Sequence, residues 1–364
     1  MVEAVLLVGG KGTRLRPLTV NTPKPMLPTA GVPFLHHVLA KAAAAGVDHV
    51  VLATSYRPEV FRNGLGDGSL TVGGHRLRID LVTEDEPLGT AGGIRNVASL
   101  LEGGPDEPVV ILNGDVLSGH DLAAQIAAHV SAGADATLHL TEVEDPRAFG
   151  CVPTDSDGRV TAFLEKTPDP VTNRINAGCY VFRRSVVDAI PAGRPVSVER
   201  ETFPGLVAAG ALVIGHVDPA YWLDLGTPAA YVQGSRDLVR GLAASPALPG
   251  PVGESLVLPG AQVAADAVLR GGTTVGSGAR VGAGATVEGS VLLDGAEVGA
   301  GAVVRASVVG VRARVGAGCH LDGVVVGDGA DLGAGNELAA GARVWCDVTI
   351  PAYAIRFSPD QPSS

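Results

Sequence analysis

The stretch "LLVGGKGTRLRPLTVNTPKPMLP", Leu6–Pro28, joins an apolar run to a glycine-rich turn and a group of cations. The run "AVLLV" (4–8) is typical of a buried strand, and a glycine-rich turn directly after such a strand is typical of α/β proteins. The chain has 27 Lys+Arg, but its only lysines are Lys11, Lys24, Lys41 and Lys166. A lysine in an arginine-rich chain suggests a position where a compact ammonium matters more than a planar fork.

Short apolar runs alternate with amphipathic stretches up to about residue 241. Strands are predicted at 4–8, 49–54, 77–83, 109–113 and 136–143, and helices at 32–46, 89–104 and 120–133. Strands that alternate with helices indicate βαβ units and a mixed, mostly parallel sheet flanked by helices, so we expect a Rossmann-like α/β domain over 1–241. Ligands of such sheets bind outside the carboxyl ends of the strands. The loops after 4–8 and 109–113 should therefore face the same crevice.

A second architecture follows a proline- and glycine-rich linker at 242–253. Aliphatic residues then recur at steps of six, six and five, so that a 17-residue period runs from Val275 through Leu292 and Val309 to Val326. A repeat this short cannot bury its own apolar face and must stack coil upon coil. Three aliphatic corners per coil predict a triangular prism of parallel strands over 254–356, followed by a tail at 357–364.

Composition excludes several classes of protein. The net charge of −11 argues against a nucleic-acid partner, which needs a broad basic face. No apolar run approaches the length of a membrane span, and the opening "EAVLLVGG" predicts a strand rather than a signal peptide. The four cysteines lie far apart, as expected of reduced thiols in a cytoplasmic protein.

The first loop has the properties of an anion site. It matches neither the Walker pattern nor G-x-G-x-x-G, yet its bare backbone N–H groups can approach phosphate oxygens. Arg14 can form a forked contact with two phosphate oxygens, and Lys24 supplies a point charge. The alternative is an ordinary turn with solvated cations.

Several further motifs occur in a fixed order along the first 241 residues. They are "EPLGTAGG" (86–93), "LNGD" (112–115), "FGCV" (149–152), "FLEK" (163–166), "NAGCYVF" (176–182), "SVERETFP" (197–204) and "YWLDLGTP" (221–228). With the first loop, they resemble the signatures of the sugar-1-phosphate nucleotidylyltransferases. Several members of that family continue into a left-handed β-helix of hexapeptide repeats. The combination is most similar to the mannose-1-phosphate guanylyltransferases, also called GDP-mannose pyrophosphorylases.

The resemblance implies a reaction and a set of site residues. The reaction is Mg²⁺-dependent attack of mannose-1-phosphate on the α-phosphorus of GTP, which yields GDP-mannose and pyrophosphate. Catalytic roles are implied for Arg14, Lys24, Asp115 and Lys166, and Mg²⁺ ligation for Asp115 and Asp224. The implied nucleotide-binding residues are Gly9, Gly10, Gly12, Thr13, Arg14, Lys24, Glu84, Gly89 and Thr90. Those implied for the sugar phosphate are Gly150, Glu165, Lys166, Asn176 and Gly178.

The residue types suit this chemistry. A phosphate monoester is already ionised at neutral pH and needs no general base, so fixed cations and a metal have to offset the repulsion between two anions. Asp115 follows an apolar run, and ligands bind just outside the carboxyl ends of parallel strands. The alternative is a hairpin turn, in which "NGD" also occurs. An exposed Glu165–Lys166 pair is by itself usually solvated charge. Position 167 is Thr, where the family commonly has Pro.

The base is expected to be guanine because of Glu84. In the family, the residue five before the glycine of "LGTAG" contacts the base, and relatives that use uracil or thymine often have Gln there. A carboxylate only accepts hydrogen bonds, and guanine offers N1–H and N2–H₂ donors on one edge.

Other functions remain open from the sequence. They are glucose-1-phosphate uridylyl- or thymidylyltransfer, a non-catalytic regulatory homologue that binds the nucleotide sugar, and acyltransfer by the solenoid. We expect no membrane or nucleic-acid partner but a homo-oligomer, dimer or tetramer, formed through the C-terminal domain. Deletion of 251–364 should then alter assembly or stability more than chemistry.

Overall fold

The computed structural model describes residues 1–164 and 166–356. The chain forms two compact units: the first combines Met1–Lys11 with Leu35–Leu223, and the second combines Gly12–Phe34 with the chain from Asp224 onward. These units do not follow the divisions predicted at 241 and 254. Residues 12–34 and 224–241 group with the solenoid, because their apolar side chains pack on its strands.

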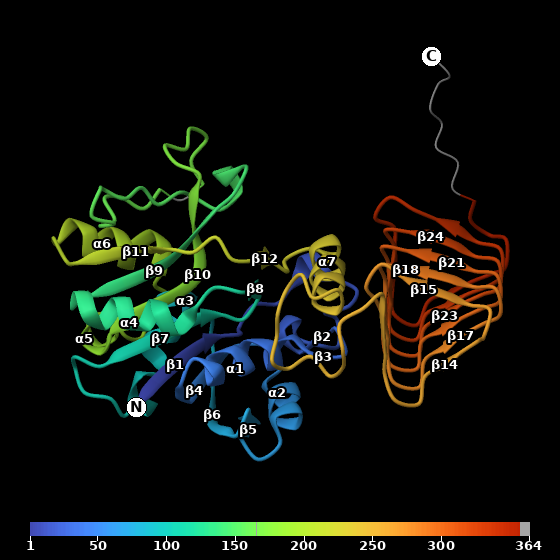
Figure 1. Ribbon diagram of the computed structural model, residues 1–364, viewed down its shortest axis with the longest axis horizontal. Coiled ribbons are helices and arrows are strands. Elements are labelled where there is room, and N and C mark those ends of the chain that lie inside the picture. Colours follow the sequence, from blue (N-terminus) through green and yellow to red (C-terminus); the bar gives the residue numbers. More distant parts are fainter. Residues whose placement is uncertain (165, 357–364) are drawn as a thin grey trace. The chain divides into compact units, whose positions relative to one another are not determined.

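The first unit is built on an eight-stranded sheet with the order β11-β9-β10-β7-β1-β4-β6-β5 (Figure 1). Its strands are β1 (Val2–Leu7), β4 (Val47–Thr54), β5 (Ser69–Val72), β6 (His75–Thr83), β7 (Pro108–Asn113), β9 (Ala136–Glu142), β10 (Arg174–Arg183) and β11 (Val213–Val217). The pairs β7–β1, β1–β4, β4–β6 and β11–β9 are parallel. The pairs of β10 with β7 and β9, and of β5 with β6, are antiparallel. This confirms the predicted mixed, mostly parallel sheet.

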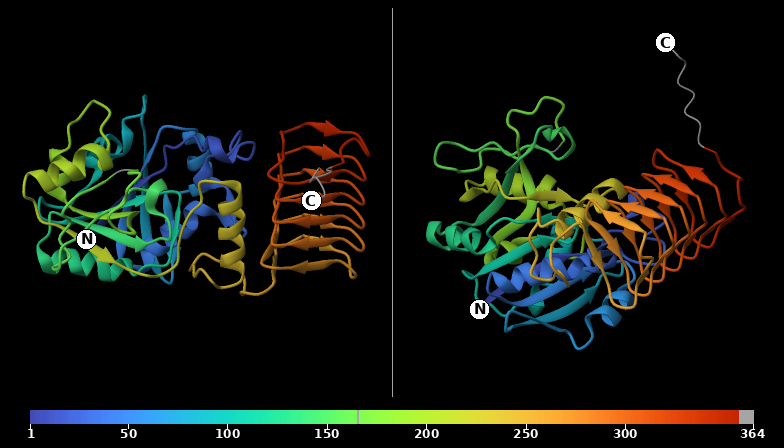
Figure 2. Two further views of the ribbon diagram at one scale, coloured as in Figure 1. Left: turned by 90° about the horizontal axis from the view of Figure 1, so that it is seen from above. Right: turned by 45° about the vertical axis from the view of Figure 1, so that its right-hand side comes forward.

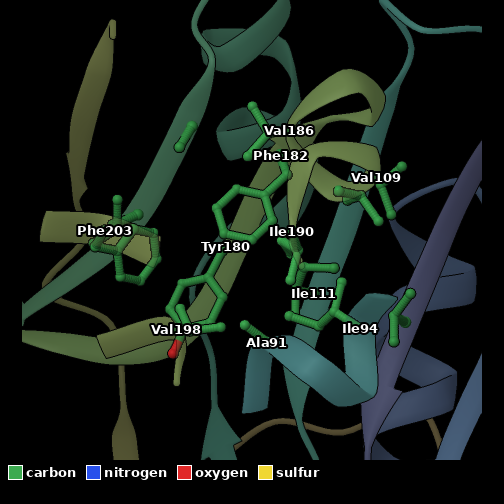
Figure 3. Packing of buried hydrophobic residues seen from close by; sticks show 14 of the residues in the cluster. Ala91, Ile94, Val109, Ile111, Tyr180, Phe182, Val186, Ile190, Val198 and Phe203 are labelled. Atoms are coloured by element: carbon green, nitrogen blue, oxygen red, sulfur yellow. The ribbon is translucent and has the colours of Figure 1, made fainter. Parts of the chain in front are cut away.

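Helices cover both faces of this sheet. They are α1 (Phe34–Ala44), α2 (Pro58–Leu65), α3 (Gly89–Asn96), α4 (Leu122–Ala132), α5 (Arg184–Ala189) and α6 (Phe203–Ala208). Side chains of α3, α5 and α6 join the main core, where Tyr180, Phe182 and Phe203 pack together (Figure 3). On the opposite face, His129 of α4 bonds to the hydroxyl of Thr137 in β9, whose side chain alternates away from that core. Every helix of the described residues is too short or too polar to span a bilayer.

The second unit begins with an irregular segment of short elements. They are two 3-10 turns, Thr13–Leu15 and Lys24–Met26, and the hairpin of β2 (Pro28–Thr29) and β3 (Val32–Pro33). After the first unit's residues, the chain returns as α7 (Pro228–Val239), which begins after Thr227, whose side chain accepts a hydrogen bond from the Ala230 amide.

The solenoid consists of three parallel sheets, seen as stacked coils in Figure 2. Its strands are β13 (Ser255–Val257), β14 (Gln262–Val263), β15 (Val268–Arg270), β16 (Thr273–Val275), β17 (Arg280–Val281), β18 (Thr286–Glu288), β19 (Val291–Leu292), β20 (Glu297–Val298), β21 (Val303–Arg305), β22 (Val308–Val309), β23 (Arg314–Val315), β24 (His320–Asp322), β25 (Val325–Val326), β26 (Asp331–Leu332), β27 (Glu337–Leu338), β28 (Arg343–Val344) and β29 (Thr349–Ile350). The register pairs Val275 with Leu292, Val309 with Val326, and so reproduces the predicted 17-residue period. All pairs are parallel, as expected of a parallel β-helix.

The coils at both ends of the solenoid are one residue longer. Val257 pairs with Val275, and Val326 with Val344, each a step of 18 residues. The interior is aliphatic with a short polar ladder, in which the Ser307 amide donates to Ser290 Oγ. The outer sides of two sheets carry charges that pair between coils, as Arg280 does with Glu297 at 3.2 Å.

One solenoid sheet carries apolar rather than charged side chains on its outer side over three successive coils. The outward residues Val291, Val308 and Val325 pack with Leu15, Leu18 and Leu27 of the irregular segment and with Tyr231 and Val232 of α7. The Tyr231 hydroxyl also bonds to the Pro28 carbonyl. The irregular segment, which carries the predicted cations Arg14 and Lys24, therefore packs against the outer side of this solenoid sheet.

Candidate active site

The loops after β1 and β7 lie side by side at the carboxyl edge of the parallel strands. The Gly114 amide donates to the Leu7 carbonyl at 3.0 Å, and Ser55, after β4, donates its hydroxyl to the Gly9 carbonyl at 3.0 Å. Asp115, the residue after Gly114, is half-buried. The next strand, β8 (Val116–Ser118), pairs with β12 (Trp222–Asp224) rather than with β7, so "NGD" is not the turn of a β-hairpin.

The beginning of β10 reaches the same edge, because β10 runs antiparallel to β7. Asn176 accepts the Gly178 amide at 3.2 Å and donates to the Tyr180 hydroxyl at 2.8 Å. Gly178 has φ 77°, and a Cβ there would lie 2.8 Å from Asn113 Nδ2. A side chain at 178 is therefore excluded twice, by conformation and by space.

Glu84 directly follows strand β6, which pairs with β4, and its amide donates to the Thr54 carbonyl at 2.7 Å. Its carboxylate accepts the Leu88 amide at 3.3 Å, and a Cβ on Gly93 would lie 2.7 Å from its Oε1. Burial raises the pKa of Glu84, and the bond from Leu88 partly offsets this effect. The side chain is thus held at the strand end by backbone contacts.

Gly89 and Thr90 are the first residues of α3, and Thr90 contacts the segment 197–199, whose residues were not predicted to belong to the site. The Thr90 hydroxyl donates to Glu199 Oε2 at 3.0 Å and accepts the Val198 amide at 2.8 Å. Ser197 donates to the same Glu199 oxygen at 2.8 Å. The motif "SVERETFP" contains these partners, and its Val198–Thr202 forms a π-helix, a feature frequent at functional sites. The Thr90 side chain therefore stabilises the position of this segment beside the start of α3.

The residues predicted for the sugar phosphate are less closely grouped. Gly150 is buried with φ 84° and follows Phe149, whose ring packs edge-to-face on Trp222 at 5.3 Å. Lys166 is exposed and has φ 46°. Glu165 lies outside the described residues.

The second unit brings together three predicted residues that are far apart in the sequence. Lys24 Nζ lies 3.6 Å from Asp224 Oδ1, with side chains only 10% and 29% exposed. A Cβ on Gly226 would lie 2.6 Å from the guanidinium of Arg14 and 3.0 Å from Asp224 Oδ1. Because Gly226 has no side chain, the side chains of Arg14 and Asp224 have room to lie beside it. Gly12, which has φ 58°, and Thr13 start the turn that leads to Arg14.

Asp224 has the character of a cation ligand. Its Oδ1 is buried and has no hydrogen-bond partner among the described residues. Within 1–164 and 166–356, no three His, Cys, Asp or Glu side chains gather into a metal cluster. Mg²⁺ is commonly bound by one or two carboxylates together with phosphate oxygens and water, so an acceptor such as Asp224 Oδ1 fits this ion.

Comparisons with known proteins identify the family of the chain. Residues 3–241 match the family described as "Nucleotidyl transferase", and residues 251–346 match the "GMPPB C-terminal domain". The chain is 58% identical to the mannose-1-phosphate guanylyltransferase of Mycobacterium tuberculosis, over 99% of this chain and 98% of that protein. It is 36% identical to mannose-1-phosphate guanylyltransferase 1 of Arabidopsis thaliana, over 85% and 86% of the two chains.

A solved structure matches the fold of part of the chain. HddC from Yersinia pseudotuberculosis, crystallised in complex with GMP-PN, is 27% identical with a TM-score of 0.55. The match covers 65% of this chain and 99% of that one. The predicted resemblance and the predicted enzyme class are thereby confirmed. The chain is an enzyme of the nucleotidyl transferase family that continues into a GMPPB C-terminal domain.

Proposed function

We propose that this protein transfers a guanylyl group from GTP to mannose-1-phosphate and releases pyrophosphate. The observation that carries the proposal is the 58% identity, over 99% of the chain, to a protein named for this activity. A second relative with the same name comes from a plant, so the match does not depend on one lineage.

The proposed mechanism is in-line attack of a sugar-phosphate oxygen on the α-phosphorus. The attacking monoester is ionised at neutral pH, so no general base is needed. The barrier is electrostatic, and it falls when fixed cations surround the phosphates. Arg14 and Lys24 are proposed to bind the triphosphate, with backbone amides of the loop from Gly9 to Thr13.

Asp115 and Asp224 are the proposed Mg²⁺ ligands. Asp224 Oδ1 is buried and accepts no hydrogen bond among the described residues, which supports the second of these assignments. The place of Asp115 just after a parallel strand supports the first. A bound Mg²⁺ supplies positive charge that neutralises phosphate oxygens. The chain's own residues contribute the positions of the two carboxylates and of the cations.

The sugar phosphate is proposed to bind where β10 begins. Lys166 supplies a charge for its phosphate, and Glu165 a hydrogen-bond acceptor for a hydroxyl. Gly150, Asn176 and Gly178 are proposed to line the sugar. The close packing of Gly178 on Asn113 supports a wall here that a side chain at 178 would disturb.

Glu84→Gln is expected to lower the preference for GTP over UTP at least about 10-fold in kcat/KM. The carboxylate accepts hydrogen bonds from guanine N1–H and N2–H₂, and replacing one of its oxygens by an amide NH₂ removes part of that acceptor set. The ratio is measured with both nucleotides at one mannose-1-phosphate concentration. An unchanged ratio would show that another residue selects the base.

We also propose a cytoplasmic homo-oligomer, dimer or tetramer, formed through residues 254–356. All four cysteines are free, which supports a reducing compartment. Large apolar side chains are exposed near the end of the solenoid, among them Trp345 at 47% and Tyr353 at 79%. Such surface supports association. Light scattering of the full chain and of Trp345→Glu tests this.

The decisive experiment is a pyrophosphate-release assay across four nucleoside triphosphates and three hexose-1-phosphates. The proposal predicts the highest kcat/KM for GTP with mannose-1-phosphate, and no turnover without a divalent ion. Highest kcat/KM with UTP or dTTP and glucose-1-phosphate would favour the uridylyl- or thymidylyltransferase alternative. Binding of nucleotide sugar without turnover would favour a regulatory role.

A further inference from the structure

Lys41 is a lysine to which the proposed reaction gives no role. It lies in α1 and is largely buried, and its Nζ donates to the Ser118 carbonyl at 2.8 Å. The same nitrogen lies 2.8 Å from Nδ1 of His120. An ammonium at such a position needs acceptors on every side, and both of these come from the end of β8 and the residues after it.

The partners of His120 determine which of its nitrogens carries the proton. Nε2 lies 3.0 Å from Gln125 Oε1, an acceptor that also receives the thiol of Cys179 at 3.3 Å. His120 therefore donates from Nε2, and its Nδ1 accepts from Lys41 and from the Ser118 hydroxyl at 2.8 Å. The contacts form one connected network from α1 to the core strands.

The surroundings of Lys41 keep the histidines neutral and leave Lys41 as the charged member. His120 stacks on His139 at 3.7 Å, and burial lowers the pKa of both rings well below the ordinary value. Burial also lowers the pKa of Lys41, to about 8, against the opposing influence of Cys179, Asp218 and Asp121. Among the described residues, His216 is a further titratable neighbour of this network, and it lowers the pKa of both His120 and His139.

The strand held by Lys41 is the one that starts directly after Asp115. β8 ends at Ser118, and the next amide, of Gly119, donates to the Tyr221 carbonyl at 2.7 Å. The Asp121 amide donates to Asp218 Oδ2 at 3.0 Å. The bond from Lys41 to Ser118 thus anchors the strand at the end away from Asp115, beside its first contact with the 218–223 segment.

We propose that Lys41 is a positioning residue that fixes β8, and through it Asp115, by holding the Ser118 carbonyl and His120 from α1. The role assigned to Asp115 rests on the proposed function, but the anchoring of β8 does not. The charge and the stem length of lysine both matter here, because the acceptors lie deep and no other cation in the network supplies the donors.

Lys41→Met tests this proposal, because methionine keeps an unbranched stem and removes the donors. Hydrogen–deuterium exchange at the Gly119 amide is expected to speed up about 3- to 10-fold, the scale of one lost hydrogen bond. Mn²⁺ binding in the presence of GTP, followed by electron paramagnetic resonance, is expected to weaken about 10-fold, as for loss of a supporting contact behind a ligand. Ser118→Ala is the comparison variant, because it removes the hydroxyl that contacts His120 but keeps the carbonyl that Lys41 holds, and it should change both measurements less than Lys41→Met does.

Each outcome of these measurements supports or overturns one part of the proposal. Wild-type exchange at Gly119 in Lys41→Met would overturn the anchoring role, and global unfolding of the variant would make Lys41 a stability residue instead. Faster exchange with unchanged Mn²⁺ binding would overturn the link to Asp115. Failure of the wild-type protein to bind Mn²⁺ with GTP would count against the proposed function, while the exchange result would still test the anchor.

The pH dependence of unfolding adds a second readout for the buried ammonium. The pKa of Lys41 is about 8 in the folded protein and near the ordinary 10.5 when unfolded. Between these values the unfolded chain binds more protons, so the stability of the wild type rises with pH through this window relative to Lys41→Met. Below pH 8 both states are protonated and the difference is constant. Equal pH slopes for the two proteins between pH 8 and 10 would show that Lys41 is not desolvated.

Discussion

Lys24→Ala is expected to lower kcat at least about 100-fold, the scale for losing a preorganised charge partner of the transition state. The Lys24 side chain is only 10% exposed and lies 3.6 Å from Asp224 Oδ1. Its loss removes a cation from the proposed triphosphate site and also leaves the Asp224 carboxylate without its nearest counter-charge. The measurement is pyrophosphate release at saturating GTP, mannose-1-phosphate and Mg²⁺.

Arg16→Ala is the matched control for this substitution. Arg16 belongs to the same irregular segment and is also cationic, but its side chain is exposed. Its removal tests whether general positive charge on the segment is sufficient, and kcat should stay within about 3-fold of the wild type because exposed charges contribute little. A similar loss in both variants would mean that Lys24 acts through the overall field rather than through its place beside Asp224.

The hydrophobic pattern predicted those elements whose neighbours are close in sequence or repeat regularly. The run 109–113 became β7 at Pro108–Asn113, and the 17-residue period became the register of the solenoid. In both, a buried side chain at each regular step determines the structure. The predicted helix 89–104 instead ends at Asn96 and continues as a 3-10 turn at Ala98–Leu100.

The contacts that hold the candidate site were less predictable, because they join residues about a hundred positions apart. Thr90 meets Glu199, and Lys41 meets His120, through side chains that look like ordinary helix or loop residues in the sequence. Local pattern carries no information about such pairs. The scarcity of lysine was a usable signal for Lys24 and Lys41, since both lie in buried polar surroundings where the structure gives a compact ammonium its partners.

The grouping of residues 12–34 with the solenoid also could not be read from the pattern. Leu15, Leu18 and Leu27 are separated by polar and proline-rich positions, and only the structure shows that they share one cluster with Val308. This changes what the C-terminal domain is expected to do. Deletion of 251–364 removes the cover from three buried leucines, so we now expect chemistry to suffer along with stability.

Val308→Asp is expected to lower turnover at least about 100-fold without touching any substrate. Val308 is fully buried, and its side chain packs with Leu15 and Leu18 on the segment that carries Arg14 and Lys24. A carboxylate in this apolar cluster costs several kcal/mol unless the cluster opens. Opening it releases the two cations from the base that holds them, and preorganised charge is lost. The measurement is kcat together with the melting temperature.

Val309→Ala, one residue further along the same strand, separates this effect from damage to the solenoid. Its side chain is equally buried but faces the interior of the coils, so the substitution leaves a cavity that costs about 2 kcal/mol and leaves the outer face intact. We expect a lower melting temperature with kcat within about 2-fold of the wild type, because preorganisation of the cations depends on the outer face alone. Wild-type turnover in folded Val308→Asp would show that the solenoid does not support the catalytic loop. Turnover lost equally in both variants would mean that the coils act only through overall stability.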